Sequence, residues 1–212
     1  KKSLNEIDIA EINFIKGQSY YELKNYSKSI EYLNKISVNH AQSAGFIKEY
    51  HLLKANCYQA LFNYSEANSN YFSFTKLSND VNLLTDINLK ILMNMSKLMH
   101  YKDVISHADM ISEKYKLSQE DEILRILQKA KAYFQMQNYD ETINFLNANN
   151  IPENNYNIEK MFIIAGAYFN KKDYKNSNKY YLELLDKYSD NKYSGDIKMA
   201  VATNYKLLGD MD

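Results

Sequence analysis

The histidines are the side chains of this 212-residue chain that could bind a metal ion. They are His40, His51, His100 and His107, and no two of them stand four residues apart, the helical spacing at which two histidines hold zinc beside a carboxylate. His100 adjoins a predicted turn and His107 lies on a predicted helix, where packing or solvation is the simpler role. We therefore expect neither a metal centre nor any other cofactor.

The single cysteine, Cys57, is the thiol that could act as a nucleophile. Nucleophilic cysteines depend on a neighbouring base that lowers the thiol pKa, and such a base cannot be identified from the sequence. Cys57 adjoins Tyr58 in an apolar periodic stretch, which is typical of a small packing residue. The sequence also has neither a glycine loop that would cradle phosphate nor a serine nucleophile elbow. These observations predict that the protein is not an enzyme.

The charge balance argues against nucleic acid as a partner. The chain has 26 Lys plus Arg and 26 Asp plus Glu, so its formal charge is zero, whereas proteins that bind phosphate backbones carry a basic excess. No apolar run reaches the roughly 18 residues of a membrane span, so we expect no membrane insertion of this segment. We expect a soluble chain, cytoplasmic or, if a leader has been removed, periplasmic.

The elements that carry these residues are predicted to be long helices. Hydrophobic residues make up 45% of the chain, and there are only 5 Gly and 1 Pro to make tight turns. Asn and Lys alternate with apolar residues at helical spacing, which indicates the solvated faces of amphipathic helices.

The chain repeats itself with a period of about 37 residues. A tyrosine follows a polar residue between two apolar periodic stretches at Tyr26, Tyr64, Tyr101, Tyr139 and Tyr174, and the spacings between these tyrosines are 38, 37, 38 and 35. We call them the turn tyrosines. Such a fixed period predicts a stack of similar helical units.

Residues at fixed offsets from the turn tyrosines follow one packing rule. Nine residues before them stand Gly17, Ala55, Leu92, Ala130 and Ala165. Three residues after them stand Ser29, Ala67, Val104, Thr142 and Ser177, and seven after stand Leu33, Tyr71, Ala108, Leu146 and Tyr181. Offsets of three, four and seven place residues on one helical face. The pattern predicts that a small residue on a first helix receives side chains from a second.

This pattern resembles the tetratricopeptide repeat (TPR) family, in which a small residue on the first helix receives bulky residues of the second and a tyrosine fills the turn between them. The segments 17–21 with Tyr26 and 165–169 with Tyr174 match the family best. The third repeat departs most from it, because Leu92 stands where a small residue is expected.

The resemblance implies an all-α fold, a right-handed α-α superhelix (TPR solenoid) of five helix-turn-helix repeats and a C-terminal helix that caps the array or is truncated. It covers residues 1–212 as a single domain. The repeats are predicted at about 10–39, 48–78, 85–115, 123–150 and 158–190, and the last helix at 195–208. Ala202 and Tyr205 take the small and aromatic positions of that helix.

The resemblance also implies that first helices line a concave wall on which a partner binds. Its side chains stand three before and one, four and five after each small residue. The predicted partner-binding residues are Phe14, Tyr21, Asn56, Gln59, Leu127, Phe134, Phe162, Gly166, Phe169, Asn170 and Met199. The same rule places Lys131 and Gln135 on the wall of the fourth repeat. The alternative is that these side chains pack on their neighbours and on the last helix.

The wall predicts a scaffold that binds an extended peptide or a partner helix through a few aromatic anchors. Two alternatives stay open. One is a sensory or regulatory module of a larger signalling protein, such as a sensor kinase. The other is a bacterial envelope or outer-membrane assembly TPR lipoprotein, which the stretch from Tyr180 to Tyr193 resembles. The sequence leaves the partner's identity and the oligomeric state open.

Acidic residues recur near the predicted start of first helices, at Glu11, Glu49, Asp86, Glu159 and Asp196. A stripe of carboxylates could attract a ligand. We interpret them instead as complements of the helix dipole, which favours negative charge at a helix N-terminus.

Overall fold

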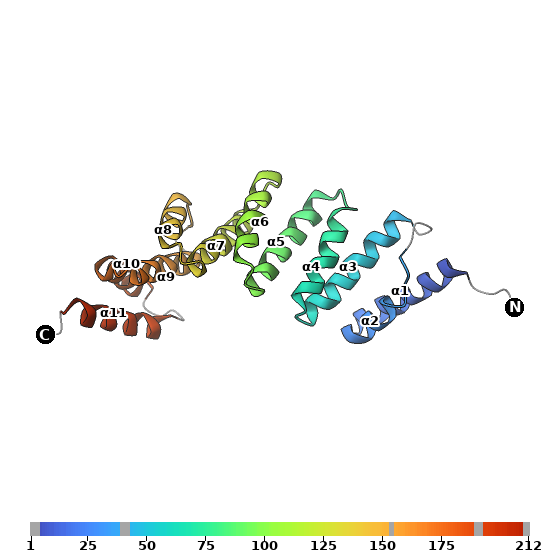
Figure 1. Cartoon of the computed structure of the whole chain (residues 1–212), viewed down its shortest axis with the longest axis horizontal. Helices are drawn as coiled ribbons and strands as arrows, with labels where there is room; N and C mark the ends of the chain where they lie inside the picture. Colours follow the sequence, from blue (N-terminus) through green and yellow to red (C-terminus); the bar gives the residue numbers. More distant parts are fainter. Residues whose placement is uncertain (1–4, 39–42, 153–154, 189–192, 210–212) are drawn as a thin grey trace. The chain divides into compact units, whose positions relative to one another are not determined.

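The computed structural model describes residues 5–38, 43–152, 155–188 and 193–209, and every regular element in these ranges is an α-helix. The helices, labelled in Figure 1, are α1 (Glu6–Glu22), α2 (Tyr26–Leu33), α3 (Ala44–Ala60), α4 (Tyr64–Thr75), α5 (Val81–Lys97), α6 (Tyr101–Lys114), α7 (Gln119–Gln135), α8 (Tyr139–Ala148), α9 (Asn155–Asn170), α10 (Tyr174–Lys187) and α11 (Ser194–Leu208). The expected all-α class is confirmed.

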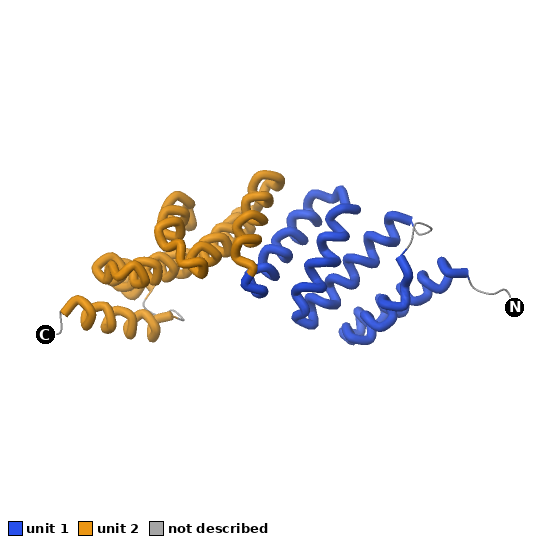
Figure 2. Tube along the Cα trace, viewed as in Figure 1, with its two compact units in different colours: residues 1–99 blue, residues 100–212 orange. Residues whose placement is uncertain are grey.

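The chain divides into two compact units, coloured separately in Figure 2. Unit 1 is Lys1–Met99 and holds α1 to α5, and unit 2 is His100–Asp212 and holds α6 to α11. Inside each unit, helices that follow one another in the chain pack together. The boundary falls within the predicted third repeat, and the prediction of one domain over residues 1–212 stays a prediction.

The turns before α2, α4, α6, α8 and α10 share one backbone conformation. After α1, Lys24 adopts a left-handed conformation with φ 56°, its N–H donates to Tyr21 O, and the N–H of Asn25 donates to Tyr20 O at 2.9 Å. This arrangement satisfies the last carbonyls of the helix. The side chain of Asn25 then caps α2. The left-handed residues at the same place in the other four turns are Phe62, Met99, Gln137 and Lys172, with φ between 59° and 63°.

Each turn tyrosine is the first residue of the helix that follows its turn. The residues nine before, three after and seven after the turn tyrosines are all buried, as the packing rule predicts. In the first repeat, Ser29 Oγ donates to Gly17 O at 2.7 Å, and Leu33 has no exposed surface. A Cβ added to Gly17 would lie 2.9 Å from Leu33, which explains why glycine stands there.

The last described helix, α11, packs on α10 through Ile197, which shares a core cluster with Tyr181 and Leu184. Ala202 and Tyr205, predicted for the small and aromatic positions, are exposed. The physical reason is that, in the residues that the structure describes, no helix follows α11 to cover that face.

The acidic residues do not all lie where the helix-dipole interpretation needs them. Helices α3, α5 and α9 have no acidic residue in their first turn, because Glu49, Asp86 and Glu159 lie further along. The dipole field falls off within that turn, so the interpretation is wrong for these three and for Glu11, which lies beyond the first turn of α1. Asp86 instead pairs with Lys90 of the next turn at 2.8 Å.

Candidate functional site

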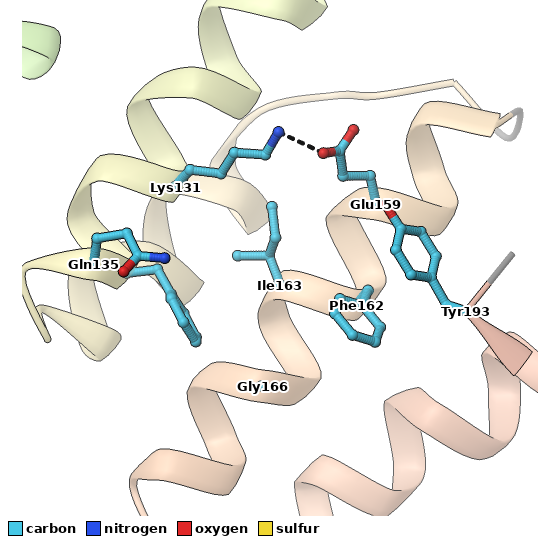
Figure 3. Close-up of a pocket in the computed structure, with 8 residues that line it drawn as sticks. Lys131, Gln135, Glu159, Phe162, Ile163, Gly166 and Tyr193 are labelled. Atoms are coloured by element: carbon cyan, nitrogen blue, oxygen red, sulfur yellow. Dashed lines mark ion pairs between the residues drawn. The ribbon is translucent and has the colours of Figure 1, made fainter. Parts of the chain in front are cut away.

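A pocket of about 280 Å³ lies in unit 2, between α7 and α9. Its lining residues are Lys131, Phe134, Gln135, Glu159, Phe162, Ile163, Gly166 and Tyr193. Figure 3 shows Lys131 and Gln135 on one helix facing Glu159, Phe162 and Ile163 on the other. The pocket therefore lies on faces of two first helices, which is where the sequence placed the partner-binding wall.

Aromatic rings form much of the pocket wall. Phe162 stacks on Tyr193 with ring centroids 4.6 Å apart and planes 18° from parallel. The ring of Phe162 also meets the edge of Tyr181, at 5.9 Å. Phe134, on the opposite helix, packs edge to face with Tyr139 at 5.5 Å. Because each ring is held by a neighbouring ring, the wall is fixed before any ligand arrives.

Charge is confined to one ion pair at the pocket rim. Lys131 Nζ and Glu159 Oε1 are 2.5 Å apart and join α7 to α9, as the dashed line in Figure 3 marks. Both side chains are partly exposed, so the pair adds little to stability. It presents one cation and one anion beside an otherwise apolar hollow.

Gly166 keeps the pocket open. A Cβ added at this position would meet Phe134 at 3.4 Å and the Tyr181 hydroxyl at 3.9 Å, which is ordinary contact. A methyl group therefore fits there, whereas a longer side chain would enter the pocket. The open space at this point of α9 exists because glycine has no side chain.

Of the predicted partner-binding residues in unit 2, the structure brings Phe134, Phe162 and Gly166 together in the pocket. The other predicted partner-binding residues of unit 2 do not line the pocket. Leu127 is 2% exposed and belongs to a core cluster, so its predicted place on the partner-binding surface is wrong. Asn170 is exposed and donates to Gly166 O, Phe169 is half-buried, and Met199 is 72% exposed on α11.

In unit 1, the two predicted aromatic residues pack within the unit. Phe14 lies against Phe46 with ring centroids 5.2 Å apart, and Tyr21 meets the edge of Tyr26 at 5.6 Å. Both predicted residues are half-buried. Burial raises the pKa of the Tyr21 phenol, so the hydroxyl stays neutral at physiological pH.

The two predicted amides of unit 1 are held by hydrogen bonds from inside the unit. Asn56 Oδ1 accepts from the Tyr71 hydroxyl at 2.8 Å, and Gln59 Oε1 accepts from Asn94 Nδ2 at 2.6 Å. Both bonds fix the side chains of first helix α3. These residues belong to a different unit from the pocket, and they are not part of it.

Three pocket residues were missing from the prediction: Glu159, Ile163 and Tyr193. Ile163 stands two before Ala165, an offset outside the wall rule. Glu159 had been interpreted as a helix-dipole complement. Tyr193 precedes α11, where no periodic position marks it. Only the fold shows that its ring reaches Phe162.

Two of the side chains that could do chemistry, Cys57 and His51, make hydrogen bonds within unit 1. Cys57 is fully buried, its Sγ donates to Ser29 Oγ at 3.2 Å, and burial raises the pKa of the thiol. Such a thiol is a poor nucleophile because little of it is ionised. His51 Nδ1 lies 3.1 Å from Asn70 Oδ1. His40 lies outside the described residues.

The comparisons with known proteins bear on the repeated helix pairs. The family model for the tetratricopeptide repeat matches residues 13–43 and 161–191. The chain contains tetratricopeptide repeats. The matched segments fall on the predicted first and fifth TPR repeats, and both have the turn and the buried small residue described above. The resemblance stated from the sequence is thus confirmed.

No curated protein sequence matches the chain. Among solved structures, the crystal structure of the P58(IPK) TPR domain is similar, with 14% sequence identity and a TM-score of 0.42. That alignment covers 96% of this chain and 66% of the other, so the chain spans just under two thirds of its length.

TPR repeats are typical of non-catalytic scaffolds that bind other proteins, which supports a general role of this kind for the chain. Within the described ranges, none of the helices combines the length and the apolar character needed to cross a bilayer.

Proposed function

We propose that the chain is a scaffold that binds a peptide segment of a protein partner on α7 and α9 of unit 2. One apolar side chain of that peptide enters the pocket between Phe134 and Phe162. The observation that supports this proposal is a preformed hollow, walled by rings and opened by Gly166, on the faces of two TPR first helices.

The size of the pocket favours a peptide side chain over a small-molecule ligand. Pockets for drug-sized ligands hold roughly 300 to 1,000 Å³, so a volume of about 280 Å³ is at or below the lower limit of that range. One large side chain fits within such a space. The rings of Phe134, Phe162 and Tyr193 can offer edges and faces to an inserted ring, so we expect an aromatic anchor.

The rim of the pocket would orient the rest of the peptide. Lys131 and Glu159 are partly exposed and lie beside the apolar wall, together with the amide of Gln135. A few polar groups around an apolar pocket fix the direction of a ligand. We therefore expect the bound peptide to carry polar or charged residues next to its aromatic anchor.

The test is the selection of binders from a displayed random-peptide library on the purified chain, followed by affinity measurement on the Gly166→Leu variant. The added side chain occupies part of the pocket and raises helix propensity, so binding is weakened while the fold is kept. We expect an affinity loss of about 30-fold, corresponding to one anchor residue of about 2 kcal/mol.

Two matched variants serve as controls. Gly166→Ala adds a methyl group that fits the available space, and it should keep most of the affinity. Gln18→Leu places a leucine at the equivalent position of α1, in unit 1, and should leave binding unchanged. If Gly166→Leu binds the selected peptides as tightly as the unchanged chain, the pocket is not the binding site.

A further inference from the structure

The outer face of α1 carries a stripe of exposed isoleucines. Ile9, Ile12 and Ile15 are 45%, 38% and 60% exposed, and their spacing of three residues keeps them on one side of the helix. The opposite side of α1 holds the buried residues Ala10 and Gly17. We call Ile9, Ile12 and Ile15 the isoleucine stripe.

The position of the stripe within the repeat shows that its face is normally covered. Ile12 stands five residues before the small residue Gly17. The residues at that offset in α3, α5 and α11 are Tyr50, Ile87 and Ile197, which are 5%, 0% and 0% exposed. Each shares a core cluster with residues of the second helix before it. Among the described residues, no helix precedes α1 in the chain and covers that face.

The stripe is complementary to itself. If two copies of α1 lie antiparallel with their Ile12 side chains on a two-fold axis, residue 9 of one copy faces residue 15 of the other. The same register sets the half-buried Asp8 against the exposed Lys16, which carries the opposite charge. Ile9 of each copy then meets Ile15 of the other, the two Ile12 side chains meet on the axis, and Asp8 meets Lys16. A two-fold contact requires this kind of self-complementarity.

We propose that the isoleucine stripe binds the stripe of a second copy of this chain, as an antiparallel helix pair centred on Ile12. The second copy supplies a helix for the face that a second helix covers in α3, α5 and α11. The contact involves one helix from each copy, so the association is weak and depends on concentration. It is separate from the pocket of unit 2 and does not depend on peptide binding.

The central test is oxidative cross-linking of the Ile12→Cys variant by glutathione disulfide. Packed helices lie 8 to 10 Å apart at their axes, which brings two residues on the axis of the pair within reach of a disulfide. We expect a covalent dimer that forms at least about tenfold faster than in a Val81→Cys control, although Val81, on α5, is the more exposed of the two positions, at 60% against 38%. The native Cys57 is buried and leaves the assay unaffected.

The register is tested with mixed copies. Ile9→Cys chains should cross-link with Ile15→Cys chains faster than with one another, because residue 9 faces residue 15 only in the antiparallel register. Equal rates, or no excess over the Val81→Cys control, overturn the proposal.

Sedimentation equilibrium gives a test without cysteine variants, over protein concentrations from about 5 to about 500 µM because a contact this small gives a weak dimer. The unchanged chain and Val81→Asp should dimerise as concentration rises, and Ile15→Asp should stay monomeric. Circular dichroism checks that Ile15→Asp keeps its helix content. A chain that is monomeric throughout the range, or an Ile15→Asp variant that dimerises normally, contradicts the proposal.

Discussion

Two glycines on first helices, Gly17 and Gly166, differ in what surrounds them. A Cβ on Gly17 would lie 2.9 Å from the fully buried Leu33, whereas a Cβ on Gly166 would be no closer than 3.4 Å to any neighbour. Leu33 cannot move aside, because the core around it is packed. At Gly17 the glycine is needed for close helix packing, and at Gly166 it opens a pocket.

The two alanine substitutions should therefore change stability in opposite directions. Gly17→Ala should destabilise unit 1 by about 1 to 3 kcal/mol through overpacking, despite the higher helix propensity of alanine. Gly166→Ala should be neutral or stabilise by up to about 1 kcal/mol. Urea denaturation followed by circular dichroism measures both. Equal effects of the two substitutions would show that the contact with Leu33 does not decide the choice of glycine.

The sequence predicted the residues that pack but not those that complete the pocket. The turn tyrosines and the small residues recur at fixed offsets, because each repeat solves the same packing problem. Lys24 and Phe62 adopt left-handed conformations that residue type alone would not suggest, since glycine is the usual choice there. Tyr193 enters the pocket from outside any helix, so no periodicity reveals it.

Buried asparagine pairs join helices in both units. Between α10 and α11, Asn204 Nδ2 donates to Asn178 Oδ1 at 2.7 Å and to Ser177 Oγ at 3.0 Å. Asn94 and Asn68 form the equivalent bond between α5 and α4 at 2.8 Å. Such pairs can fix helix register, because a shift would leave amides buried without partners.

The equivalent positions between α8 and α9 hold Ile143 and Ala167, both buried. Asn178 and Asn204 can therefore be replaced by isoleucine and alanine, the residue types that the chain has at the equivalent positions between α8 and α9. The Asn178→Ile, Asn204→Ala double variant should be as stable as the unchanged chain or more stable. Asn204→Ala alone should lower the free energy of unfolding by about 1 to 3 kcal/mol, because it leaves the side-chain oxygen Oδ1 of the buried Asn178 without a donor.

Thermal and urea unfolding of the two singles and the double variant gives the coupling between the positions. If the double variant loses as much stability as the two singles together, the amides do not depend on each other and this account of the pair is wrong.

At the scale of the whole molecule, each unit has core clusters of its own. Leu33, Tyr50 and Phe74 lie in clusters of unit 1, and Leu146 and Leu184 lie in clusters of unit 2. The pocket lies wholly within unit 2 and the isoleucine stripe within unit 1. The two proposed binding surfaces can thus be tested independently.

The unit boundary, between Met99 and His100, falls in the repeat that departs most from the family pattern. Its first helix carries Leu92 where the other repeats have glycine or alanine. The sequence predicted the helices on either side of this boundary because their periodicity is local. It did not predict the division, because contacts over long range decide which helices group together.

Hydrogen–deuterium exchange with and without a selected peptide tests the central claim most directly. Binding in the pocket stabilises the two helices that line it against local opening, and this slows their amide exchange. The account predicts protection concentrated in α7 and α9 of unit 2, absent in the Gly166→Leu variant, with exchange in α1 to α5 unchanged. Protection confined to unit 1, or equal protection in Gly166→Leu, would contradict it.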